Sequence, residues 1–255
     1  PKPVIGFSDI GIDPNEGNDC RGNEQYTAGS FLIEKLLGGF IKQDRDDLYV
    51  ATKVGYTGGA SRANITAHFD RCRKQLDQDA VDLLYMHRFD PDTPLEETFS
   101  TLAELQHAGA IRHIGVSNYN EERLKEILDA GLAKPEANQV EFHPICAQID
   151  LTRYMKENSI TPIAYSSLAP LSTWRIEEGQ GGEVLAEIKE ECQLATHEIA
   201  TKLKVSEPKL LLRWGLQHGY CVLTKSSKPE RIRENLNLFD FEIPDNDMAH
   251  LNSLN

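Results

Sequence analysis

The sequence predicts an α/β protein with the fold of a (β/α)8 TIM barrel. From residue 47 onward, apolar segments of strand length alternate with helical patterns, and this alternation implies a parallel sheet with helices outside it. The chain has 255 residues, and a single barrel commonly takes roughly 250. No GxGxxG turn follows any expected strand, although an open doubly wound sheet would often have one. We therefore expect one barrel domain over residues 1–255.

The strands are expected where short apolar runs occur. The run 3–7 resembles a first strand, and 47–54 reads as a buried strand. The strands that follow are expected at 81–87, 111–116, 138–142, 161–165 and 220–224.

The helices are expected where apolar residues recur at helical spacing. The segment 62–77 has this spacing, and Gly109 gives the usual stop signal at the end of the next helix. The segment 170–182 is glycine-rich and is expected to be irregular. The full set of expected helices is 62–77, 95–109, 121–130, 151–158, 183–203, 207–218, 230–238 and 245–254.

Composition narrows the class of protein. The chain is 40% hydrophobic and 26% charged, which is typical of a soluble globular protein. A net charge of −13 disfavours binding to nucleic acid or to an anionic membrane, since both usually need a basic face. The five cysteines are widely spaced without a CxxC, so we expect reduced thiols in the cytoplasm and no metal site. No signal peptide or apolar run of membrane length is visible.

The segment 223–236 predicts a helix that starts immediately after a strand. Ser227 and Glu230 have the spacing of a capping box, and Pro229 suits the first turn, where its missing N–H costs nothing. We therefore expect the helix to begin with Ser227 as its cap.

Cations gather at the start of this helix. Lys225, Ser226 and Arg231 would surround its N-terminus, where free N–H groups and the helix dipole favour anions. In an acidic protein this predicts a local phosphate pocket. Taken alone, the segment is equally consistent with a capped surface helix that carries solvated Lys and Arg side chains.

Polar residues also follow nearly every expected strand. In a parallel barrel, the C-terminal ends of the strands carry the functional residues. Each residue has an ordinary structural alternative, such as a rim lysine, a structural histidine, a helix cap or a side chain that fills the barrel. Their recurrence favours a functional site. In chain order the residues are Lys53, His87, Ser117, Asn118, Gln139, Glu141, His143, Tyr165, Ser166, Ser167, Lys225 and Ser226.

These segments resemble the aldo-keto reductases, which are NAD(P)H-dependent (β/α)8-barrel enzymes. The matching pieces follow the order of the family across residues 47–242. They are Thr52-Lys53-Val54; Val81-Asp82-Leu83 with His87; Gly109-Ala110-Ile111-Arg112 with Gly115-Val116-Ser117-Asn118-Tyr119; Asn138-Gln139-Val140-Glu141-Phe142-His143-Pro144; Ala164-Tyr165-Ser166; and Lys225-Ser226 with Arg231, Glu234 and Asn235.

The resemblance implies a site for the nicotinamide end of a cofactor. Ser117, Asn118 and Gln139 would hydrogen-bond the carboxamide, and Tyr165 would stack on the nicotinamide ring. Two further residues are expected to contact the cofactor, Ser166 and Leu168.

The resemblance also gives a role to the helix start. Lys225, Ser226 and Arg231 would bind the 2′-phosphate of the adenosine ribose, while Glu234 and Asn235 would contact adenine. This arrangement favours NADPH/NADP over NADH, because the cations would otherwise lack a partner.

The catalytic set implied by the resemblance is an Asp, a Tyr, a Lys and a His. The tyrosine gives a proton to the carbonyl oxygen, and a phenol with a pKa of about 10 needs a nearby lysine to do so near neutral pH. Lys53 and His87 match their family positions. Asp13 is the best match for the aspartate, and Asp19 is second.

The catalytic tyrosine has no counterpart at the expected place. Cys20 and Arg21 precede Gly22-Asn23-Glu24, and no tyrosine occurs before Tyr26. Compared with the family, at least one βα unit is expected to be compressed or missing between Phe7 and Gly22, so the resemblance implies a barrel whose N-terminal βα region is incomplete. A similar gap is expected near 170–182. The C-terminal loop that shapes substrate specificity in the family is short or absent.

Three explanations stay open. The first, which we favour, is that part of the chain between Phe7 and Gly22 is not in the sequence, since loops beside a cofactor are mobile. The second is a truncated or mis-spliced variant. The third is a diverged protein that lost the usual donor, in which Tyr26, Tyr56, His87 or Cys20 would give the proton.

The leading functional hypothesis is NADPH-dependent reduction of an aldehyde or ketone by a protein that is a monomer or a weak oligomer. The alternative is a catalytically impaired protein that binds NADPH for a regulatory or scaffold role. A third hypothesis is a phosphate-binding barrel with other chemistry, such as an isomerase or aldolase. The substrate is expected to be a small carbonyl compound of unknown identity.

Arg88 occupies a position where many members of the family carry an aromatic residue. Its side chain could face a polar or anionic substrate, although a surface salt bridge is the default expectation.

Overall fold

The computed structural model describes most of the chain from residue 34 to the C-terminus and a short strand before it. The described residues are 4–6, 34–35, 37–39, 41–56, 58–173, 175–176 and 182–255. The chain divides into two compact units. The first consists of residues 1–139 with 158–160, and the second of residues 140–157 with 161–255.

The first unit is built on parallel strands. β1 (Val4–Gly6) pairs with β2 (Tyr49–Val54), β2 with β3 (Val81–Met86), and β3 with β4 (Ile111–Ser117). β4 then pairs with the first residues of β5 (Ala137–Glu141), and every one of these pairings is parallel. The expected alternation of strands and helices is therefore confirmed in this unit.

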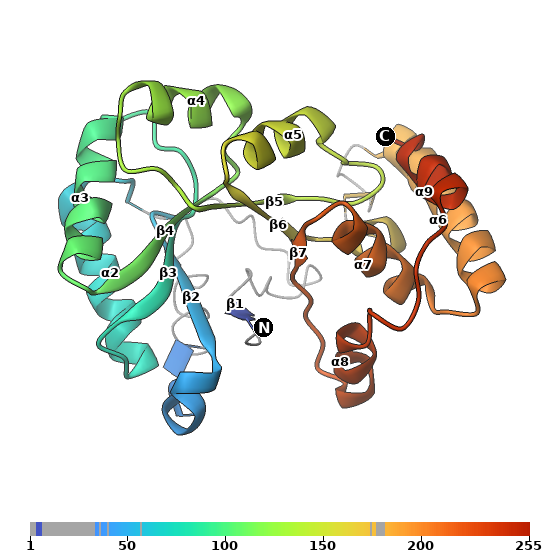
Figure 1. Ribbon diagram of the computed structural model, residues 1–255, viewed down its shortest axis with the longest axis horizontal. Helices are drawn as coiled ribbons and strands as arrows, with labels where there is room; N and C mark the ends of the chain where they lie inside the picture. Colours follow the sequence, from blue (N-terminus) through green and yellow to red (C-terminus); the bar gives the residue numbers. More distant parts are fainter. Residues whose placement is uncertain are drawn as a thin grey trace. The chain divides into compact units, whose positions relative to one another are not determined.

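Helices cover the strands of the first unit. α2 (Arg62–Leu76) contacts β2 and α3 (Leu95–His107), and α3 contacts β4 (Figure 1). α4 (Glu121–Asp129) follows β4, and a short 3-10 helix, η2 (Arg45–Asp47), leads into β2. α2 forms because its apolar residues share one face, which is buried at Ile65, Phe69, Cys72 and Leu76.

A buried carboxylate joins the starts of the strands. Asp82 on β3 accepts a hydrogen bond from the Val50 N–H at 2.7 Å, and it pairs with Arg45 at 2.9 Å and Arg112 at 3.0 Å. The two guanidinium groups and the backbone donor compensate the charge of this side chain, which is 1% exposed. Asp82 is therefore accounted for as a structural residue.

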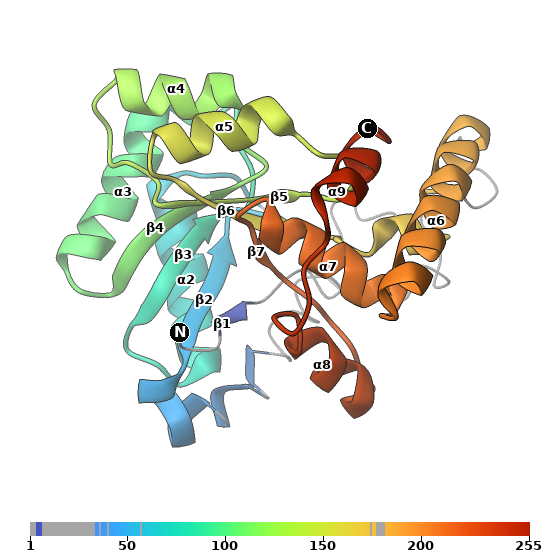
Figure 2. The ribbon, with the colours of Figure 1, turned by 45° about the vertical axis from the view of Figure 1, so that its right-hand side comes forward.

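The second unit has shorter strands and more helix. β6 (Thr161–Tyr165) pairs in parallel with β7 (Cys221–Val222), and α5 (Ile149–Glu157) contacts β6. α6 (Glu183–Leu203) contacts α7 (Glu207–Gln217) and α9 (Asp245–Asn252), as Figure 2 shows, and α7 contacts β7 and α8 (Pro229–Leu236). η3 (Ala169–Leu171) is a short 3-10 turn after β6.

An aromatic stack forms the core of the second unit. The Phe142 ring lies on the Tyr220 ring with centroids 3.7 Å apart, and on the Trp214 ring with centroids 4.7 Å apart. The Tyr220 hydroxyl lies 2.6 Å from the Thr152 hydroxyl, so the polar end of this buried ring has a hydrogen-bond partner.

Two sequence predictions need correction. The last strand is only two residues long, where 220–224 was expected. α8 begins with Lys228 at the N-cap position, and no side chain among the described residues caps it. The predicted capping box of Ser227 and Glu230 is therefore wrong: the hydroxyl that turns the chain belongs to Ser226, whose Oγ accepts from the Lys228 N–H at 3.1 Å.

Candidate active site

Strand ends bring Lys53 and His87 to the same edge of the sheet in the first unit. Lys53 is the second-last residue of β2 and registers with Tyr85 on β3, and His87 follows β3 directly. The His87 N–H donates to the Val54 carbonyl at 2.8 Å, which continues the strand pairing by one residue. Parallel strands end at a common edge, so the two predicted catalytic residues are neighbours.

Gly115 on β4 leaves space for the ring of Tyr85 on the neighbouring strand β3. Tyr85 registers with Gly115 on β4, and a Cβ atom at Gly115 would lie 2.5 Å from the Tyr85 ring. Glycine is therefore required at this position for the tyrosine ring to lie against the neighbouring strand.

The next strand end carries the Ser117-Asn118 turn. The Ser117 hydroxyl donates to the Gln139 carbonyl at 2.9 Å, and the Asn118 N–H donates to the same carbonyl at 2.9 Å. Asn118 has a φ of 62°, a left-handed conformation that asparagine adopts more readily than most residues. Its side chain reaches back to the Ser117 hydroxyl at 3.3 Å and to the His87 carbonyl at 3.5 Å.

This geometry excludes the helix-cap interpretation of the turn. The cap of α4 is Asn120, whose side chain accepts from the Arg123 N–H at 3.0 Å. Ser117 and Asn118 lie before the cap and are occupied with Gln139 and His87 instead. Asn138 was not singled out by its own position in the sequence, but its amide donates to the Tyr119 carbonyl at 2.8 Å and so anchors the turn.

Gln139 carries an unsatisfied polar atom in the interior. Its side chain is 1% exposed, and its Oε1 has no hydrogen-bond partner among the described residues. A buried amide oxygen without a donor costs roughly 1–3 kcal/mol. Such an atom is suited to accept from a ligand amide, and a carboxamide next to Ser117 and Asn118 fits this chemistry.

Tyr56, one of the possible proton donors, and Arg88 lie beside His87. The Tyr56 ring lies against the His87 ring with centroids 4.7 Å apart, and the Arg88 guanidinium lies 4.2 Å from the centroid of the Tyr56 ring. The default expectation of a surface salt bridge at Arg88 is wrong for the described part of the chain, where its contact is this cation–π stack.

The remaining predicted cofactor residues lie in the second unit. Tyr165 ends β6, and its carbonyl accepts from the Phe142 N–H at 3.2 Å. Ser166 follows with a left-handed φ of 54°, and Leu168 is the N-cap residue of η3. Between them, Ser167 is 4% exposed, and its hydroxyl has no hydrogen-bond partner within the described part of the chain.

The predicted phosphate residues surround the start of α8. Lys225 and Ser226 lie between β7 and α8, and Arg231 is exposed in the first turn of that helix. The N-terminus of α8 lacks a side-chain cap from the described residues, which leaves its N–H groups available to an anion. Farther along α8, Glu234 is partly exposed and Asn235 is buried.

A charged cluster in the second unit was not predicted. Glu141 pairs with Arg175 at 3.1 Å and lies 3.1 Å from His143 Nε2. Burial raises the pKa of Glu141, but the His143 hydrogen bond and the Arg175 charge outweigh burial, so the pKa lies below its ordinary value. Glu141 and His143 were visible as strand-end residues, whereas nothing in the irregular segment 170–182 singled out Arg175.

Some predicted residues cannot be placed. The predicted site residues outside the described part of the chain are Asp13, its alternative Asp19, and the possible donors Cys20 and Tyr26.

Within the described part of the chain, no helix has both the length and the apolar character to span a membrane.

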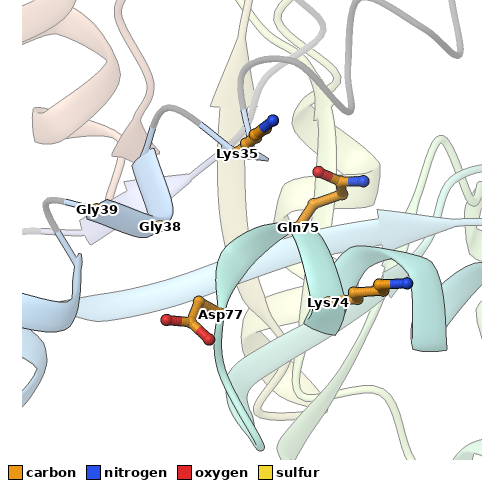
Figure 3. Close-up of a pocket in the computed structure, with 6 residues that line it drawn as sticks. All are labelled: Lys35, Gly38, Gly39, Lys74, Gln75 and Asp77. Carbon is orange, nitrogen blue, oxygen red and sulfur yellow. The ribbon is translucent and has the colours of Figure 1, made fainter.

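A separate cavity lies away from these strand ends. It has a volume of about 460 Å³ and lies between the C-terminal end of α2 and the preceding segment (Figure 3). The cavity contains none of the predicted site residues. Its lining is Lys35, Gly38, Gly39, Lys74, Gln75 and Asp77.

Comparison with known proteins gives consistent matches. The sequence matches the model of the aldo/keto reductase family over residues 25–255. Glyoxal reductase of Bacillus subtilis is 34% identical over 234 residues, covering 90% of this chain and 77% of that protein. The structure of the thermostable aldo-keto reductase Tm1743 with the inhibitor epalrestat has a TM-score of 0.75 and 29% identity, covering 87% of this chain and 77% of that one. A Bombyx mori aldo-keto reductase in complex with NADP has a TM-score of 0.72 and 25% identity, with coverage of 87% and 75%.

Proposed function

The chain belongs to the aldo/keto reductase family, and from this premise we propose that it reduces an aldehyde or ketone to an alcohol with NADPH. The observation that carries the proposal is the buried amide of Gln139 beside Ser117 and Asn118, which leaves an acceptor for a carboxamide. The NADP complex of the Bombyx mori relative supports the choice of cofactor.

The proposed roles follow from the chemistry of each side chain. NADPH supplies the hydride when it is bound. Ser117, Asn118 and Gln139 orient the carboxamide, and Tyr165 offers a flat ring for stacking. Ser166 and Leu168 contribute further contacts to the cofactor.

The cation-rich start of α8 is the proposed site for the 2′-phosphate. Lys225, Ser226 and Arg231 would hold this group, and Glu234 and Asn235 would contact adenine. The local cations oppose the overall charge of −13, which favours an anion that is bound at one place.

On the carbonyl side, His87 orients the substrate oxygen by a hydrogen bond from its imidazole. Lys53 holds a positive charge at the same strand edge, and such a charge lowers the pKa of a nearby proton donor. Asp13 is proposed to pair with Lys53. The donor itself is not assigned to a described residue.

The test is NADPH oxidation with a panel of aldehydes, monitored for the wild type and for Lys53→Met. We expect the variant to lose at least about 100-fold in kcat, because general acid catalysis contributes about 10²–10⁴. Cofactor binding, followed by quenching of protein fluorescence, is expected to persist. Unchanged turnover in Lys53→Met would contradict the assigned mechanism.

The same experiment distinguishes the alternative functions. NADPH binding without turnover of any carbonyl compound would favour the regulatory or scaffold protein. Failure to bind NADPH, together with binding of a sugar phosphate, would favour a barrel with other chemistry. We also propose that the chain forms a single barrel domain. A monomeric or weakly oligomeric state can be tested by sedimentation velocity, and a cytoplasmic location by cell fractionation.

A further inference from the structure

Arg88 is a cation beside His87 that no described carboxylate neutralises. Its side chain is exposed, and its contact within the described residues is the stack on Tyr56 at 4.2 Å. Exposed arginines commonly pair with nearby acids, as Arg123 does with Glu126 at 2.7 Å. Arg88 instead keeps its N–H donors available within the described part of the chain.

The nearest acidic residue along the chain is already occupied. Asp90 Oδ2 accepts from the Ala60 N–H at 2.7 Å and from the Thr93 hydroxyl at 2.7 Å, while Oδ1 accepts from the Asp92 N–H at 3.1 Å. These hydrogen bonds fix Asp90 in the loop between β3 and α3, away from a pairing role with Arg88. Gly59 makes the arrangement possible, because a Cβ atom there would lie 2.5 Å from the Asp90 carboxylate.

The stack holds Arg88 close to the carbonyl-orienting residue. Both groups contact the Tyr56 ring, whose centroid lies 4.7 Å from the His87 ring centroid and 4.2 Å from the Arg88 guanidinium. A cation over an aromatic face gains about 0.5–1 kcal/mol at exposed sites and loses part of its freedom to move. The guanidinium and the imidazole therefore share contact with one aromatic ring.

We propose that Arg88 binds a carboxylate of the substrate, so that the preferred substrates are short oxo acids whose carboxylate lies a few bonds from the carbonyl. This inference rests on the proposed function, since it assumes that His87 orients a carbonyl group. The planar guanidinium matches a carboxylate with two parallel hydrogen bonds. In a chain of net charge −13, a cation that no described carboxylate neutralises favours the binding of an anion at this place.

The test compares 4-oxobutanoate with its methyl ester, which has the same carbonyl group without the negative charge. For Arg88→Met we expect kcat/KM for 4-oxobutanoate to fall about 10- to 100-fold, chiefly through KM, because hydrogen bonds to charged groups are lost. For the ester, kcat/KM of Arg88→Met is expected to stay within about 2-fold of the wild-type value, because binding of this neutral substrate does not use the charge of Arg88. Arg88→Lys is expected to fall between the wild type and Arg88→Met, since it keeps the charge and loses the fork.

Arg123→Met is the matched control. Arg123 also stacks on an aromatic ring, 4.1 Å from the centroid of Phe89, but its guanidinium is engaged by Glu126. We expect this variant to leave the preference for acid over ester unchanged. Circular dichroism checks that the variants are folded, and competitive inhibition of the wild type by succinate, relieved at high salt, gives a measurement independent of them.

The outcomes separate the two proposals. An unchanged acid-to-ester ratio in Arg88→Met, with the ester still reduced, overturns the role of Arg88 and leaves the proposed function standing. An equal loss for both substrates also overturns it, because that result is expected of a general structural defect. If the wild type reduces neither these two compounds nor any other carbonyl, the proposed function fails and this inference fails with it.

Discussion

At the scale of single residues, the carboxyl of Glu34 is a buried acidic group outside the site. It is 4% exposed; its Oε1 accepts from the Thr52 hydroxyl at 2.7 Å, and its Oε2 is buried without a hydrogen-bond partner among the described residues. Burial raises the pKa of Glu34, and the hydrogen bonds from Thr52 and Cys72 only partly offset this effect. Thr52 precedes Lys53, so this buried carboxyl contacts β2 one residue before the proposed catalytic lysine.

We expect Glu34→Gln to be more stable than the wild type near neutral pH. The folded protein holds the Glu34 proton above the ordinary pKa of 4.5, so the wild type loses stability as pH rises from that value through the raised pKa. The neutral amide avoids this loss. A gain on the order of 1 kcal/mol corresponds to about 2–4 °C in Tm for a domain of this size.

The measurement is thermal unfolding at about pH 4.5 and about pH 7.5, with the difference in Tm between variant and wild type compared at the two values. Glu190→Gln is the control, because Glu190 is exposed on α6. A difference that is the same at both pH values would argue against a buried titrating carboxyl at residue 34.

At the scale of elements, the sequence predicted the bounds of the helices more accurately than the hydrogen bonds at their ends. The apolar spacing of 62–77 and the stop at Gly109 agree with α2 and α3 to within a few residues, because a helix buries one stripe and this periodicity is visible in the chain. β7 is shorter than the expected strand 220–224. The hydrogen bond before α8 could not be predicted, because Ser226 and Ser227 are adjacent and only the backbone direction decides which hydroxyl reaches an N–H group.

The two helix starts give a direct comparison. Asn120→Ala is expected to lower the free energy of unfolding by about 1 kcal/mol, because the side chain caps α4 through the Arg123 N–H. Ser227→Ala is expected to change it by less than about 0.5 kcal/mol, as for an ordinary surface substitution. Urea unfolding of both variants measures the difference. A larger loss for Ser227→Ala than for Asn120→Ala would restore the capping-box interpretation of α8.

At the scale of the whole molecule, the order of motifs along the chain is enough to indicate the family, because the motifs fall at successive strand ends. The grouping of Lys53, His87, Ser117 and Gln139 was predictable because these residues lie at or near the C-terminal ends of strands, and parallel strands end at one edge. The stack of Arg88, Tyr56 and His87 was not predictable, because it depends on how the loop after β2 turns back over the loop after β3.

The net charge of −13 leads to a prediction about cofactor choice. The overall field of an acidic protein opposes a nucleotide that carries an extra phosphate, so the local cations Lys225 and Arg231 must overcome it. The double variant Lys225→Met with Arg231→Met is expected to weaken NADPH binding about 10- to 100-fold, through the loss of charge-assisted hydrogen bonds. NADH binding is expected to change by less than about 3-fold, since NADH lacks the 2′-phosphate. Fluorescence titration with both nucleotides measures these effects.

The control is the double variant Arg153→Met with Lys204→Met, which removes the same charge from exposed positions. An equal loss of NADPH and NADH affinity in the first variant would show that these cations do not read the 2′-phosphate. An equal loss of NADPH affinity in the control would show that overall charge, and not the start of α8, sets the preference.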